Sequence, residues 1–134
     1  MTVVLDTNVV VAALTTNGLC HELLHRTIRL RILASSDLLL RELEDTLRDK
    51  FTITPATAAF LKAFRASVHL VEPAPLPAPV YRDPDDDVVL ATAVAAGAGT
   101  VVAGDKDLLV LKRYEAIAIV TPRVFLETLD RDRR

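Results

Sequence analysis

The chain has 134 residues and a formal net charge of −2 at pH 7, and 51% of its residues are hydrophobic. This length matches one domain with a substantial core, so we expect residues 1–134 to form a single domain. The single cysteine excludes a disulfide-rich scaffold and a cysteine-based zinc module. No apolar run approaches the ~18 residues of a membrane span, so we expect a cytoplasmic protein without a membrane segment.

Two biases among the charged residues bear on the partners of the protein. Twelve arginines outnumber four lysines, and the guanidinium group can bind phosphate through two parallel hydrogen bonds. Twelve aspartates outnumber six glutamates, although aspartate is a weak former of helices and strands. The net charge argues against a protein that coats DNA tightly, whereas the aspartate excess indicates a specific use for short carboxylates.

Short apolar segments alternate with segments of helical spacing along the chain. In chain order these segments predict a strand at Thr2–Leu5, helices at Asn8–Leu14 and Leu19–Leu30, a strand at Arg31–Ala34, helices at Asp37–Asp49 and Pro55–Ser67, a strand at Val68–Val71, a helix at Pro84–Ala96, a strand at Thr100–Ala103, a helix at Asp105–Leu111, a strand at Ile117–Val120 and a helix at Pro122–Leu129. Four prolines within residues 72–80 predict an extended connector.

Continuous apolar strands separated by helices are typical of a parallel sheet that is covered on both faces. The predicted fold is therefore of the α/β class. We expect a three-layer α/β/α sandwich with a central parallel sheet of short strands.

Aspartate follows two of the predicted strands. Asp6 comes directly after the first strand, and Asp105 comes just after the strand that begins at Thr100. In open α/β sheets, ligands bind beyond the carboxyl ends of the strands. Each of these aspartates also stands where a helix begins, so a role as helix N-cap is an equal alternative for either one.

Two further acids lie in predicted helices. Glu42 borders the apolar side of its helix, while Glu44 points to the opposite side. Pairing with an arginine is the structural alternative for Glu42. In the run 83–87, Asp83 and Pro84 are typical of a helix N-terminus. That explanation does not suit Asp86, because it shares a helix face with small and apolar residues.

Four acids from four predicted elements therefore form a candidate cluster: Asp6, Glu42, Asp86 and Asp105. Clustered buried carboxylates repel one another unless they are protonated or bound to cations. Hard oxygen ligands of this kind suit Mg²⁺ or Mn²⁺. The spacing of His21 and His25 on one helix also suits a metal, but a third ligand is lacking nearby.

The motifs around these acids resemble those of the PIN-domain nucleases, in an order and with separations that fit essentially the whole chain. The matching strings are Leu5–Asn8 after the first strand, Leu40–Leu43 around Glu42, Asp86–Ala93, and Gly104–Leu109. Within the family, the chain is similar to the stand-alone VapC-like toxins of toxin–antitoxin pairs.

The resemblance implies a Mg²⁺-dependent or Mn²⁺-dependent ribonuclease that hydrolyses RNA as the toxin of a type II pair. It implies catalytic and metal-binding roles for the four acids, with Asp6 and Asp86 most directly tied to the metal. Asp107 is a further candidate ligand, and Asn8 matches the residue that supports the first aspartate. RNA as substrate, a cognate antitoxin and a homodimer are the implied partners. Ala103 stands where a serine or threonine is common, so one hydroxyl contact is missing.

Two other functions stay open on the sequence alone. A regulatory or scaffold PIN-like module would keep the fold without catalysis, although such a module is expected to have lost acids that are present here. A phosphotransfer protein, either phosphatase-like or receiver-like, would need Asp-x-Asp after the first strand or a lysine at a later strand end. Here Asn8 occupies the second of those aspartate positions, and Lys106 lies at a predicted helix start.

Overall fold

The computed structural model describes residues 1–132 as helices and strands that alternate along the chain. The elements are β1 (Val3–Leu5), α1 (Thr7–Thr15), α2 (Leu19–Leu30), β2 (Leu33–Ser35), α3 (Asp37–Lys50), α4 (Pro55–Ser67), β3 (His69–Leu70), α5 (Pro84–Ala96), β4 (Thr100–Val102), α6 (Lys106–Leu109), β5 (Arg113–Tyr114), β6 (Ile117–Val120) and α7 (Pro122–Asp132). Every element that the sequence predicts is present, with small shifts at the ends.

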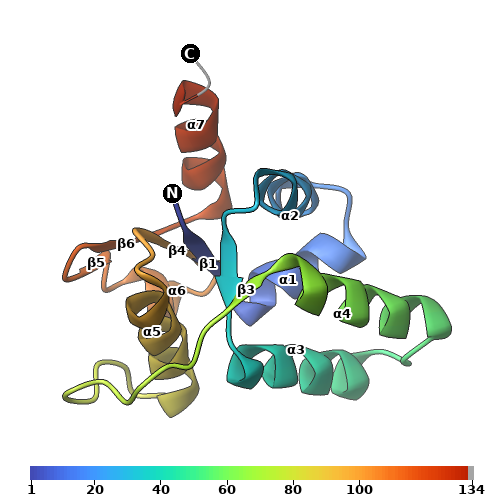
Figure 1. The fold of residues 1–134 in the computed structure, drawn as a ribbon, viewed down its shortest axis with the longest axis horizontal. Coiled ribbons are helices and arrows are strands. Elements are labelled where there is room, and N and C mark those ends of the chain that lie inside the picture. Colours follow the sequence, from blue (N-terminus) through green and yellow to red (C-terminus); the bar gives the residue numbers. More distant parts are fainter. Residues whose placement is uncertain (133–134) are drawn as a thin grey trace.

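The strands form one sheet in the order β3-β2-β1-β4-β6-β5 (Figure 1). All neighbouring pairs are parallel except β5 and β6, which are antiparallel. The chain builds outward from β1 through β2 to β3 and then returns through α5 to β4, on the other side of β1. The boundary between β1 and β4 is therefore the point where the direction of strand order reverses.

Alternate residues of the central strands enter two separate cores, as the pleat of a strand requires. Val3 and Leu5 belong to a core that includes side chains of α1, α2, α3, α4 and α7. Val4 and Val101 belong to a second core that includes side chains of α5 and α6. Helices thus cover both faces of the sheet (Figure 1). The predicted α/β/α sandwich is confirmed, and the two-sided burial explains why the strands are apolar throughout.

The structure corrects the sequence prediction at β2 and at β5. β2 begins two residues later than expected, because Arg31 is in the left-handed conformation (φ 58°) and closes α2 with its N–H on the carbonyls of Thr27 and Ile28. The two-residue strand β5 was not predicted. It forms because the chain turns back at Glu115 (φ 53°), which gives the otherwise parallel sheet an antiparallel edge.

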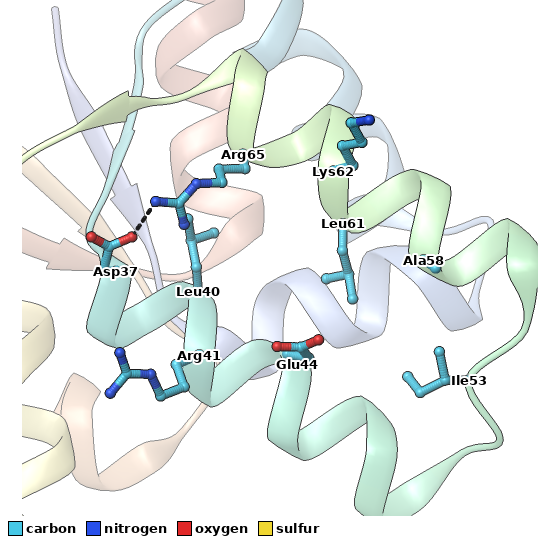
Figure 2. Close-up of a pocket in the computed structure, with 9 residues that line it drawn as sticks. All are labelled: Asp37, Leu40, Arg41, Glu44, Ile53, Ala58, Leu61, Lys62 and Arg65. Atoms are coloured by element: carbon cyan, nitrogen blue, oxygen red, sulfur yellow. Dashed lines mark ion pairs between the residues drawn. The ribbon is translucent and has the colours of Figure 1, made fainter.

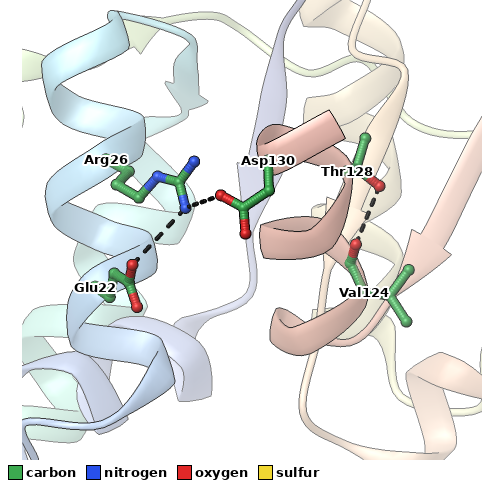
Figure 3. Close-up of polar contacts among 5 residues, drawn as sticks. All are labelled: Glu22, Arg26, Val124, Thr128 and Asp130. Atoms are coloured by element: carbon green, nitrogen blue, oxygen red, sulfur yellow. Dashed lines mark hydrogen bonds and ion pairs between the residues drawn. The ribbon is translucent and has the colours of Figure 1, made fainter. Parts of the chain in front are cut away.

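An ion pair joins α7 to α2. Arg26 is only 17% exposed and lies 2.9 Å from Asp130 and 3.7 Å from Glu22 (Figure 3). Within α7, the Thr128 hydroxyl donates to the carbonyl of Val124. The last described helix is therefore held against the core by a partly buried charge contact in addition to its apolar side chains.

Candidate functional site

The reversal of strand order between β1 and β4 brings two of the predicted acids to one edge of the sheet. Leu5 pairs with Val102, and the backbone N–H of Asp6 donates to the carbonyl of Val102 at 2.9 Å. Asp105 follows three residues after Val102. Asp6 and Asp105 therefore both lie just beyond the carboxyl ends of two neighbouring parallel strands, β1 and β4. Ligands bind at this position in open α/β sheets.

Asp6 is buried without the contacts that a structural role would give it. It is 4% exposed and stands at the N-cap of α1, yet its side chain makes no capping hydrogen bond. Its Oδ2 atom has no hydrogen-bond partner in the described part of the chain. The helix-cap alternative is therefore wrong for Asp6, and the cost of burying a carboxylate is left uncompensated.

The environment of Asp6 favours its protonated form. Burial is the largest cause that raises its pKa to about 7, followed by the charge of Glu42 and, more weakly, those of Asp86 and Asp105. A hydrogen bond from the Thr7 backbone lowers the pKa in part. The other three predicted acids are thus all close enough to act electrostatically on Asp6.

Glu42 lies on the side of α3 that faces these acids. It is half-buried, and burial followed by the charges of Asp85, Asp86 and Asp83 raises its pKa. A hydrogen bond with the Thr7 side chain acts in the opposite direction. Thr7 therefore lowers the pKa of both Asp6 and Glu42, an effect that sequence analysis missed. Its only sequence signal is its place directly after Asp6.

In the run 83–87, the carboxylates of Asp83 and Asp87 bind backbone N–H groups, whereas those of Asp85 and Asp86 do not; of these two, Asp85 is exposed and Asp86 is half-buried. Asp83 caps α5 by accepting a hydrogen bond from the N–H of Asp85 at 2.9 Å, and Asp87 accepts two backbone N–H groups from the preceding loop. Burial and then the charges of Asp83, Asp105 and Asp107 raise the pKa of Asp86 to about 6. These causes place Asp86 beside the loop that carries Asp105.

Asp105 does act as a helix N-cap, which was the alternative role considered for it from the sequence. It accepts a hydrogen bond from the N–H of Asp107 at 2.9 Å and begins α6. Its charge still raises the pKa of both Asp6 and Asp86.

Asp107 is exposed, and its charge also raises the pKa of Asp86. Asn8 is exposed on α1. The metal-binding role of Asp107 and the supporting role of Asn8 stay predictions.

A buried chain of hydrogen bonds fixes the helices that carry Glu42 and Asp86. The Leu39 N–H donates to Ser36 Oγ, which lies 3.0 Å from Thr92 Oγ1. The Thr92 hydroxyl donates to the carbonyl of Val88 at 2.8 Å, so Ser36 is the donor between the two hydroxyls. Ser36 and Thr92 are both fully buried. Neither was predicted to serve the site, because they are 56 residues apart.

The donor atoms of the cluster suit a hard divalent cation. All are carboxylate oxygens, and Asp6 presents a buried oxygen that lacks a partner. Within residues 1–132, however, no group of three or more Asp, Glu, His or Cys side chains is arranged so that it could hold a metal ion. One oxygen of Asp105 is engaged in its capping bond to the N–H of Asp107. Binding would require side-chain rotations toward a shared ion.

A groove of about 450 Å³ between α3 and α4 has an apolar floor that includes Leu61 and Ile53, and the ion pair of Asp37 with Arg65 spans it (Figure 2). Glu44 lines this groove and pairs with Arg48. It therefore points away from the acidic cluster, as predicted from the helical spacing.

The fold and the acidic cluster at its reversal point define a PIN-type α/β domain. Residues 2–107 match the PIN domain family, and the chain belongs to that family. PIN domains are generally nucleases that act on RNA or DNA. A search of curated proteins finds no match. Among the described residues, no helix has both the length and the apolar character needed to span a membrane.

Proposed function

We propose that this chain is a metal-dependent endoribonuclease that serves as the toxin of a type II toxin–antitoxin pair. The observation that carries the proposal is the state of Asp6: it is buried, its Oδ2 has no partner, and three other acids raise its pKa. Fold stability gains nothing from such an arrangement in the absence of a cation. Buried acids with strongly raised pKa values are concentrated at active sites.

The residues that would hold Mg²⁺ or Mn²⁺ are Asp6, Glu42, Asp86 and Asp105, with Asp107 at the margin of the cluster. A bound divalent cation polarises the scissile phosphate and makes water a stronger acid. Asp6 and Asp86 would be ionised when the cation is bound, because its positive charge opposes the effect of burial on their pKa values. Thr7 lies beside Asp6 and Glu42 and would favour the ionised form of both, because it lowers the pKa of each.

Single-turnover cleavage of labelled RNA tests the catalytic part of the proposal. Wild-type protein should cleave with Mg²⁺ or Mn²⁺ and should be inactive in EDTA. Asp6→Asn should lower the rate about 10²-fold or more, since a ligand charge is lost while the side-chain shape is kept. Asp49→Asn is the matched control, because Asp49 is exposed near the far end of α3. Equal rates for wild type and Asp6→Asn would contradict the proposal. Parallel reactions with single-stranded DNA show whether the enzyme prefers RNA to DNA as its substrate.

The toxin role rests on the resemblance to the stand-alone VapC-like proteins. Such a toxin would act in the cytoplasm as a homodimer and would be neutralised by an antitoxin encoded beside it. Induced expression should arrest growth, and Asp6→Asn should relieve the arrest. Growth that is unaffected by wild-type protein, together with a lack of binding to the product of either neighbouring gene, would remove the toxin role but leave the nuclease activity in place.

A further inference from the structure

A half-buried tyrosine connects the segments that carry Asp86 and Asp105. The Tyr81 hydroxyl donates to the carbonyl of Leu108 in α6 at 2.8 Å. Tyr81 lies in the loop before α5, five residues ahead of Asp86, and Leu108 lies three residues after Asp105. One hydrogen bond therefore spans 27 positions of the chain and joins the segments that carry the two acids.

The carboxylate of Asp87 holds the tyrosine in place from the other side. Asp87 Oδ1 accepts the N–H of Tyr81 at 2.8 Å, and Oδ2 accepts the N–H of Val80 at 3.2 Å. Both oxygens are thus used on the backbone of the loop, which folds it against the first turn of α5. A charged acceptor that takes two backbone N–H groups makes a strong and directional anchor.

The carbonyl that Tyr81 contacts would otherwise lack a partner from its own helix. α6 has a single turn, Lys106–Leu109, and the N–H of Lys112 donates to Leu109 rather than to Leu108. Carbonyls at the end of a helix need such an outside donor. Burial and the charges of Asp86, Asp87 and Asp6 raise the pKa of Tyr81 to about 12, so its O–H stays a donor at neutral pH.

From these contacts we propose that Tyr81 and Asp87 are positioning residues, which fix the first turn of α5 against α6 and thereby set the separation of the Asp86 and Asp105 carboxylates. This inference rests on the proposed function, because it assigns those two acids to one metal site. The contacts of the Tyr81 hydroxyl and the Asp87 carboxylate are with the protein backbone, so neither residue would need to touch a metal or a substrate. Their effect on catalysis passes through the placement of the two acids.

Tyr81→Phe is the direct test, since it removes one hydroxyl and keeps the ring. We expect the dissociation constant for Mn²⁺, measured by calorimetry without RNA, to rise about tenfold, and kcat to fall about tenfold with little change in KM, as is common when a supporting contact of a metal ligand is removed. Tyr114→Phe, on the half-buried tyrosine of β5, is the matched control and should change neither value. Asp87→Asn, which leaves one acceptor for two N–H groups, should act in the same direction as Tyr81→Phe.

Amide hydrogen exchange provides a readout that does not depend on nuclease activity. Tyr81→Phe should accelerate exchange at residues 107–110 and leave β1 unchanged. A lower thermal midpoint with unchanged Mn²⁺ affinity, kcat and α6 exchange would overturn the proposal. If wild-type protein neither binds Mn²⁺ nor cleaves RNA, the proposed function fails, and exchange at α6 still decides whether Tyr81 holds α6 against the segment before α5.

Discussion

Replacing Asp6 by asparagine should stabilise the metal-free protein at alkaline pH, even though it should lower the cleavage rate about 10²-fold or more. In the folded state the pKa of Asp6 is raised from 3.8 to about 7, first by burial and then by the charge of Glu42. The fold therefore favours the protonated carboxyl. This contribution to the free energy of unfolding is fully present below pH 3.8 and is lost as the pH rises through 7.

The size of the effect follows from the shift. About three pKa units at about 1.4 kcal/mol each give about 4 kcal/mol of lost stability once Asp6 is fully ionised. Asparagine has the same shape and no charge, so Asp6→Asn does not incur this loss. The stability of the variant relative to wild type should therefore rise between pH 5 and pH 8, by about 3 kcal/mol.

Urea unfolding in EDTA, followed by circular dichroism at several pH values, measures this difference. Comparison of the two proteins at each pH removes the contributions of acids that titrate alike in both. Asp49→Asn, at an exposed site on α3, should follow the wild-type curve within about 0.5 kcal/mol. Parallel curves for wild type and Asp6→Asn would refute the conclusion that burial and neighbouring acids hold Asp6 partly protonated.

Two further outcomes are expected. Mn²⁺ at about 100 times its dissociation constant should raise the unfolding free energy of the wild type by about 2.7 kcal/mol. Asp86→Asn should be more stable than the wild type without metal and should gain less stability from Mn²⁺. Calorimetric scans in which Mn²⁺ does not shift the thermal midpoint would count against a metal site. Ser36→Ala should cost about 1–3 kcal/mol in chemical unfolding, because Thr92 Oγ1 and the N–H of Leu39 lose a buried partner. A cost near zero would show that the buried hydroxyl chain does not hold α3 against α5.

The sequence predicted the elements well because their signals are local. Apolar strands, the N-cap at Ser36, Pro84 in the first turn of α5 and Gly97 at its end (φ 64°) each act within a few residues. The same is true of the strand-end positions of Asp6 and Asp105. The exceptions are β5 and the start of β2. They occur where Arg31 and Glu115 adopt a left-handed backbone conformation, which cannot be predicted from an arginine or a glutamate.

The contacts that give the acids their properties depended on the tertiary structure. The sequence could not tell that Asp105 caps a helix while Asp6 does not, since both follow a strand and precede a helix. Thr7 lowers the pKa of Glu42 only because α3 packs beside the start of α1.

What the sequence determined by itself is the fold class, the order of elements and the acids that the sheet topology would carry to one edge. What only the tertiary structure decided is which of those acids is buried without a partner, and which side chains set the distances between them. The physical reason is the distance along the chain over which each kind of interaction acts. Helix caps, turns and apolar periodicity act between near neighbours, whereas the bonds of Ser36 with Thr92 and of Tyr81 with Leu108 form only after the sheet has brought distant segments together.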